Sequence, residues 1–292
     1  MLNNRSKFKI LHDLKDFFFL TPEQKKLKKK WQKAHDLMLE KKFKESFTLW
    51  EEITIECPRD YAAYVMWGLA YEGEVTFNNN SKELLENAYD QYLKAISLKP
   101  ELSDAYHRYA HTLMLEASLD ADEASSLCEQ ACRMYQKAYS AIGGDYENLC
   151  FWGSALLKRA DLEKSRTKEL LQEVCIKCKK AIEIKTDGRA AYVNWSAAII
   201  GLSQINNDKE AELLGEAEEV ALKAESLEKG GGAYNLACIF ALRDNEDECK
   251  KWLRVSEEVG ELGTLKEATE DPDLCSVKDK SWFKELKWEC EK

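Results

Sequence analysis

The sequence predicts an all-α fold, a solenoid in which pairs of helices stack one after another along the chain. The first indication is that four segments of similar length can be laid over one another. These segments are Tyr61–Pro100, Ser103–Gly143, Tyr146–Thr186 and Arg189–Lys229. A fixed repeat of this size is typical of stacked supersecondary units.

Small residues recur at two phases of this repeat, which is the second indication. In the first half of the segments they stand 42, 43 and 43 residues apart, at Gly68, Ala110, Gly153 and Ser196. In the second half they stand 43 residues apart each time, at Ala95, Ala138, Ala181 and Ala224. Small side chains at fixed positions let two helices approach closely, while larger neighbours fill the groove between them.

The composition is the third indication. Apolar residues make up 45% of the 292 residues, and the chain contains only four prolines. That balance is typical of a folded helical protein with a large core.

Each segment is predicted to form two antiparallel helices with a polar break between them. In the second repeat, apolar stripes with three- and four-residue steps run over residues 61–71 and 84–96. Asn78–Ser81 separates them, and Ser81 is the expected N-cap of the second helix. Breaks at the same phase of the later repeats fall at 119–122, 159–161 and 206–208.

These packing positions resemble the tetratricopeptide repeat (TPR), a family that favours aromatic and small residues at fixed points of a helix pair. The second repeat supplies Tyr64, Trp67, Gly68, Tyr71, Ala88, Tyr92, Ala95 and Pro100. The third supplies Tyr106, Tyr109, Ala110, Ala131, Tyr135 and Ala138, and the fifth supplies Tyr192, Trp195, Ala217, Ala221 and Ala224. A degenerate first repeat and an ordinary sixth complete the match.

The resemblance covers roughly residues 27–257 and implies an α-α superhelix of about six TPR-like helix pairs. Family repeats have about 34 residues. Repeats two to five are longer between their two helices, so each helix is expected to be longer by up to a turn.

The two ends are expected to differ from the repeats. Residues 1–22 are predicted to be a basic amphipathic segment, because Phe8, Leu11, Leu14 and Phe18 recur at helical spacing. Residues 23–257 are the predicted solenoid. Residues 258–292 are the predicted C-terminal capping segment, since a solenoid needs a terminal cap with a polar outer face. In it, Asp271-Pro272-Asp273 reads as a turn, and Trp282, Phe283 and Leu286 as a short capping helix.

Charge is unevenly distributed. The formal charges of residues 1–44 sum to +8, and those of the whole chain sum to −10. Residues 45–292 therefore carry a net charge of −18. Four exposed-looking lysines stand at the front of the first repeat, at Lys25, Lys26, Lys28 and Lys29. They form either a solvated basic helix or a contact patch for an acidic partner, an anionic surface or the acidic face of another copy. The last outcome would be self-association.

No catalytic constellation stands out, so the protein is expected not to be an enzyme and to hold no cofactor and no metal. His107 and His111 have a metal-compatible spacing, and Cys175-x-x-Cys178 is a CxxC motif, but neither has the second pair that a zinc site needs. Gly230-Gly231-Gly232 lies between repeats and is expected to form a turn at a helix end rather than a phosphate cradle.

The expected compartment is the cytoplasm. The N-terminus lacks a small-residue cleavage site, and the ten cysteines fall mostly on apolar helical positions, as reduced structural thiols do. No run approaches the ~18 apolar residues of a membrane span, so stable membrane insertion is not expected. Nucleic-acid binding is disfavoured by the negative charge of residues 45–292.

The resemblance implies where a partner would bind. In the family, the first helix of each repeat lines a concave groove. The corresponding positions here form the inner-face set: His107, Arg108, His111, Phe151, Asn194, Tyr234 and Asn235. The two asparagines are expected to face one way and to suit the amides of an extended peptide. A chaperone-tail clamp is disfavoured, because Asp104 stands where that clamp needs a lysine.

The predicted function is therefore a non-enzymatic interaction module or adaptor, which binds a peptide or partner helix in the groove. The alternative is a rigid structural subunit or assembly factor of a larger complex, which uses its outer faces. Both place protein or peptide partners on a solenoid surface.

Overall fold

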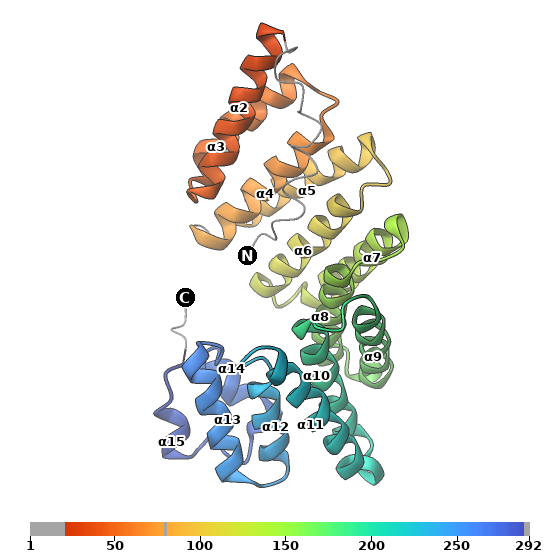
Figure 1. Cartoon of the computed structure of the whole chain (residues 1–292), viewed down its shortest axis with the longest axis vertical. Coiled ribbons are helices and arrows are strands. Elements are labelled where there is room, and N and C mark those ends of the chain that lie inside the picture. The colour runs from red at the N-terminus through yellow and green to blue at the C-terminus, as the bar shows by residue number, and fades with distance from the viewer. Residues whose placement is uncertain (1–20, 79–80, 289–292) are drawn as a thin grey trace. The chain divides into compact units, whose positions relative to one another are not determined.

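The computed structural model describes residues 21–78 and 81–288 (Figure 1). Within these ranges the secondary structure consists of helices and turns, with no β-strand, which confirms the all-α prediction. The chain divides into two compact units, residues 1–142 and 143–292. The expected amphipathic segment 1–22 lies almost entirely outside the described residues, and the boundaries at 22 and 257 stay predictions.

The described residues of unit 1 form three helix pairs. They are α2 (Pro22–Leu39) with α3 (Phe43–Glu56), α4 (Tyr61–Phe77) with α5 (Lys82–Leu98), and α6 (Ser103–Leu119) with α7 (Ala124–Ile142). Each first helix packs most extensively on the second helix of its own pair, and α3 and α5 also pack on the pair that follows.

The described residues of unit 2 form three further pairs and the C-terminal segment. The pairs are α8 (Tyr146–Leu162) with α9 (Thr167–Ile184), α10 (Arg189–Ile205) with α11 (Glu210–Leu227), and α12 (Ala233–Leu242) with α13 (Glu246–Val259). Short helices follow: α14 (Leu265–Glu270), the 3-10 helix η4 (Pro272–Leu274) and α15 (Ser281–Lys284). The 3-10 helices η2 (Lys164–Arg166) and η3 (Asn207–Lys209) stand at breaks inside two pairs.

Helix lengths explain the long repeats. The helices α4 to α11 have 17 to 19 residues each. In the sixth pair, which has the ordinary repeat length, α12 has 10 residues and α13 has 14. The extra residues of repeats two to five therefore lengthen both helices, as expected, and they lengthen the first helix by more than the one turn predicted. The fourth break falls later than predicted, because α8 continues to Leu162.

The small residues at the repeat positions allow close packing of paired helices. A Cβ at Gly68 on α4 would lie 2.5 Å from the Tyr92 ring on α5, so only glycine fits there. The later-phase alanines Ala95, Ala138, Ala181 and Ala224 are all fully buried. These small residues are therefore buried where paired helices meet, as the repeat period predicted.

Helix starts use local side chains. Thr21 forms a capping box with Gln24 at the start of α2, and Asp60 and Asp145 cap α4 and α8. Ser81 occupies the N-cap position of α5 as predicted, but its side chain makes no capping hydrogen bond.

The C-terminal segment packs on the last repeat. Phe283 of α15 is fully buried, and Leu286 joins the same core cluster as residues of α10 to α13. The indole N–H of Trp282 donates to Glu246 Oε1 of α13 over 2.7 Å. The Asp-Pro-Asp sequence, expected as a turn, begins the 3-10 helix η4, because the Asp271 carboxylate accepts from the Asp273 N–H.

Among residues 21–78 and 81–288, no helix combines the length and apolar character needed to cross a bilayer.

Candidate functional site

The inner-face set is shared between the two units, which are described separately. His107, Arg108 and His111 lie on α6 in unit 1. Phe151 lies on α8, Asn194 on α10, and Tyr234 and Asn235 on α12 in unit 2. All seven stand on first helices of their pairs, as the family resemblance implied.

The two histidines of α6 face different neighbours. The His107 ring meets the Tyr135 ring of α7 at 66°, with centroids 5.4 Å apart. His111 Nδ1 lies 3.6 Å from Glu72 Oε2 on α4. The structure thus pairs each histidine with a separate partner within unit 1.

Glu72 is a functional candidate that the sequence analysis missed. It is almost fully buried on α4, and the Tyr92 hydroxyl of α5 donates to its Oε1 over 2.8 Å. The Thr112 hydroxyl of α6 also donates to Oε1. A glutamate within the apolar stripe of the first helix was the available signal, because a charge at such a position needs buried partners.

The environment keeps Glu72 charged. Burial alone would raise the pKa of its carboxyl group. The nearby His111 imidazole, the positive charge of Arg108 and the Thr112 hydroxyl together outweigh burial, so the pKa of Glu72 lies below its ordinary value. The buried carboxylate consequently orients polar side chains in the middle of α6, His111 and Thr112.

Arg108 is held from its own helix. Its Nε lies 3.6 Å from Asp104 Oδ1, one turn earlier on α6. Asp104 is the residue that argued against a chaperone-tail clamp, and here it shares the guanidinium charge. Arg108 is thereby oriented while three quarters of its side chain is buried.

The two asparagines of unit 2 tie successive first helices together. Asn194 Nδ2 donates to the Cys150 carbonyl over 2.9 Å and to Ser154 Oγ over 3.0 Å. Asn235 Nδ2 donates to the Val193 carbonyl over 2.9 Å. Both share the same repeat position, as predicted. However, their amide donors serve the stacking of repeats, so these residues also contribute to stability.

Phe151 and Tyr234 differ in their availability. Phe151 is 40% exposed on α8. Tyr234 is partly buried on α12, and its hydroxyl donates to Asp271 Oδ2 over 2.8 Å. The C-terminal segment therefore contacts the inner-face residue of the sixth repeat, while Phe151 stays accessible.

A second polar cluster lies around Asp271 and was not anticipated. Cys238 Sγ lies 4.0 Å from Asp271 Oδ2, and the Gln204 amide donates to Asp273 Oδ1. Burial, reinforced by the charge of Asp271, raises the pKa of Asp273 to about 7. Burial and both carboxylates raise the pKa of the Cys238 thiol well above its usual value. The Asp-Pro-Asp sequence was the signal, and it had been interpreted only as a turn.

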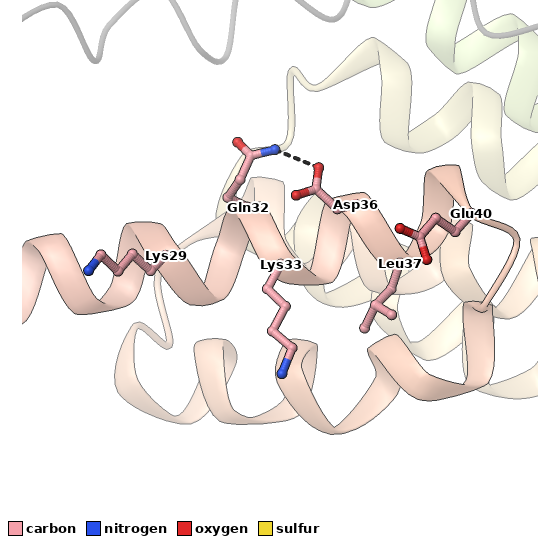
Figure 2. A pocket seen from close by; sticks show the side chains of 6 residues that line it. All are labelled: Lys29, Gln32, Lys33, Asp36, Leu37 and Glu40. Atoms are coloured by element: carbon pink, nitrogen blue, oxygen red, sulfur yellow. Dashed lines mark hydrogen bonds between the residues drawn. The ribbon is translucent and has the colours of Figure 1, made fainter.

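The predicted basic patch lies on α2. Lys25, Lys26 and Lys29 are exposed and Lys28 is partly exposed. Figure 2 shows a pocket along this helix, lined by Lys29, Gln32, Lys33, Asp36, Leu37 and Glu40. Within it, Gln32 Nε2 donates to Asp36 Oδ1 over 2.7 Å. Among the residues that line this pocket, Lys29 and Lys33 stand nearer the N-terminus of α2, and Asp36 and Glu40 stand nearer its C-terminus.

The remaining candidate motifs have structural surroundings. Burial raises the pKa of Cys175 to about 11 and also raises that of Cys178, which is fully buried on α9. In the glycine run, the N–H groups of Gly230 and Gly232 donate to the two carboxylate oxygens of Glu225. The run is therefore a turn closed by a carboxylate, as expected, and its N–H groups do not form a phosphate cradle.

Comparisons with known proteins find similarity in fold. No protein-family model and no curated protein matches the chain. Among solved structures, PilW, described as a widely conserved type IV pilus biogenesis factor, matches with a TM-score of 0.53 and 14% identity, over 86% of this chain and 97% of its own. MamA matches with a TM-score of 0.51 and 14% identity, over 69% of this chain and 91% of its own.

YrrB, described as a TPR protein with an unusual peptide-binding site, matches at a TM-score of 0.48 and 16% identity, over 72% of this chain and 91% of its own.

The consecutive helix pairs and the buried small residues at each repeat place this chain in the class of all-α helix-repeat proteins. More specifically, its fold is TPR-like, which confirms the resemblance inferred from the packing positions.

Proposed function

We propose that this protein is a non-enzymatic protein-binding module that holds a peptide or partner helix on the first helices of its repeats. A helix-repeat fold offers a long ordered surface without needing a catalytic constellation. The chemistry of the partner follows from the exposed residues of each unit.

The observation that carries this proposal is the exposure of Phe151. A large aromatic side chain that is 40% exposed is available to anchor a partner, the role that aromatic residues play at contact centres. The backbone beside it is fixed, because Asn194 bonds to the Cys150 carbonyl and to Ser154. A rigid platform reduces the entropy lost on binding.

In unit 1 the corresponding surface is charged. Arg108 is oriented by Asp104, and His111 faces Glu72. Their side chains keep 25% and 38% exposure. An acidic group of the partner would complete this arrangement through charge-assisted hydrogen bonds to Arg108.

The alternative is a structural subunit or assembly factor that uses the second helices. Exposed apolar residues favour it: Leu93 on α5, Ile176 on α9 and Leu222 on α11 are 48%, 54% and 42% exposed. Apolar residues scattered singly are common on surfaces, so this alternative ranks second.

One experiment separates the two. A photo-crosslinking amino acid is placed at position 151 or at position 176 of the full chain, and both proteins are irradiated in native extract. We expect position 151 to capture a protein that position 176 does not. The captured protein is then titrated calorimetrically, and Phe151→Ala should bind at least tenfold more weakly than Ile176→Ala. Weakening by Ile176→Ala alone would favour the structural-subunit alternative.

A further inference from the structure

We propose that Cys238, Asp271 and Asp273 bind a divalent transition-metal ion, with Zn²⁺ as the best match. One ligand atom from each residue, a thiol sulfur and two carboxylate oxygens, lies within 4.8 Å of the others. Zinc bonds of about 2.0–2.3 Å hold such atoms about 3–4 Å apart. Closing the cluster around an ion therefore needs a contraction of roughly 1 Å.

The burial and direction of the cysteine add to the argument for a ligand. Cys238 is only 3% exposed on α12, and its sulfur is directed at the carboxylates rather than at aliphatic side chains alone. The distance from its sulfur to Asp271 Oδ2, 4.0 Å, is at the outer limit for a sulfur hydrogen bond. The thiol is thus buried and aimed into the cluster without a close hydrogen bond.

The surroundings hold each carboxylate in place. Asp271 Oδ2 accepts from the Tyr234 hydroxyl over 2.8 Å, and Asp271 Oδ1 accepts from the Asp273 N–H over 2.9 Å. Asp273 Oδ1 accepts from the Gln204 amide. Hydrogen bonds of this kind orient the carboxylates that ligate metals.

The donor set selects the type of ion. A thiolate favours zinc over magnesium or calcium, which prefer oxygen ligands alone. When the metal–sulfur bond forms, the thiol proton leaves to solvent. A divalent cation also converts the repulsion between the two partly buried carboxylates into attraction. Three protein ligands leave one coordination position for water.

The site has a structural consequence. Cys238 belongs to the sixth repeat, whereas the two aspartates flank Pro272 at the start of η4. A metal ion would therefore join the C-terminal segment to α12. This inference is independent of the proposed partner-binding function.

The test is a titration of the purified, reduced full chain with Co²⁺, which reports thiolate ligation through a near-ultraviolet charge-transfer band and visible d–d bands. We expect both bands in the wild type and in Cys275→Ser, which alters an exposed cysteine close to the cluster in sequence. Cys238→Ala should lose the charge-transfer band, and Zn²⁺ should displace Co²⁺ from the wild type.

Asp273→Asn covers the case in which Cys238→Ala fails to fold, as judged by circular dichroism. This nearly isosteric change should weaken Co²⁺ binding at least tenfold. The proposal is overturned if the wild type shows no charge-transfer band, if folded Cys238→Ala retains it, or if Asp273→Asn binds Co²⁺ as tightly as the wild type.

Discussion

The side-chain amide of Asn194 donates to the backbone carbonyl of Cys150 over 2.9 Å, and so joins α10 to α8. Asn235 makes the equivalent bond to Val193 one repeat later. These two residues share the repeat position that the sequence analysis assigned to partner binding. Their first role in the structure is to connect neighbouring repeats, and this changes what their substitution should do.

Asn194→Ala and Asn235→Ala should each lower the free energy of unfolding by about 0.5–1.5 kcal/mol, the net value of a typical intramolecular hydrogen bond. Urea denaturation followed by circular dichroism measures this change. Phe151→Ala is the control, since its exposed ring contributes less to the core, and its midpoint should move little. Equal midpoints for all three variants and the wild type would show that the inter-repeat bonds contribute nothing.

Gly68→Ala should destabilise the protein by about 1–3 kcal/mol, because the added methyl group overpacks against the Tyr92 ring. Gly215→Ala is the matched control, since it lies within α11 and its Cβ would meet no atom within 4 Å. There the change should stabilise by about 0.5–1 kcal/mol through helix propensity. Thermal unfolding measures the sign and size of the stability change in both variants. A destabilisation of similar size at both positions would show that overpacking against Tyr92 is not the cause.

The titration of Glu72 should account for part of the loss in free energy of unfolding at acid pH. Its pKa is lowered in the folded state, so its contribution is present above its unfolded value near 4.5 and is lost as the pH falls through the folded pKa. Glu72→Gln should therefore be less stable than the wild type at neutral pH. The difference should shrink as the pH falls below the unfolded pKa and through the lower folded pKa, because the wild-type carboxyl then becomes protonated.

The urea midpoint of unfolding, measured from about pH 3 to about pH 7, reports this effect, because the carboxyl group titrates within that range. His111, Arg108, Thr112 and Tyr92 face the carboxyl and stay unchanged in the variant. Glu83→Gln, in the first turn of α5, provides an exposed control. A Glu72→Gln curve parallel to that of the wild type throughout this range would refute the charged state of Glu72.

Reversing the charge of lysines on α2 should have opposite effects on stability and on association. The helix dipole disfavours positive charge in the first turn of a helix. Lys25 borders that turn and Lys26 lies beyond it, so Lys25→Glu with Lys26→Glu should stabilise α2 only slightly, by about 0.3 kcal/mol in total. If these lysines contact an acidic partner or another copy, the same change should weaken that association, most strongly at low salt. Thermal unfolding and sedimentation at two salt concentrations measure the two effects.

Lys41→Glu with Lys42→Glu reverses the same amount of charge at the other end of α2. It should leave a contact at Lys25 and Lys26 nearly unchanged. Association that responds equally to both pairs would indicate a general charge effect rather than a local patch.

Much of the fold could be predicted from local patterns. The apolar period located the helix pairs, and the small residues Gly68 and Ala95 marked the close contacts between α4 and α5. The break in the fourth repeat was placed early, because the start of a 3-10 turn depends on hydrogen bonds that periodicity does not register. The lengthened helices followed from repeat length alone.

The sequence by itself determined the all-α class, the phase of the repeats and the residues on each first helix, because helical periodicity and turn chemistry act over a few residues. Only the tertiary structure decided which polar groups meet. Glu72 reaches His111 across 39 positions, Asn194 reaches Cys150 across 44, and Tyr234 reaches Asp271 across 37. Such partners depend on how helices stack, and a buried polar group is satisfied by whatever that stacking brings within hydrogen-bond distance.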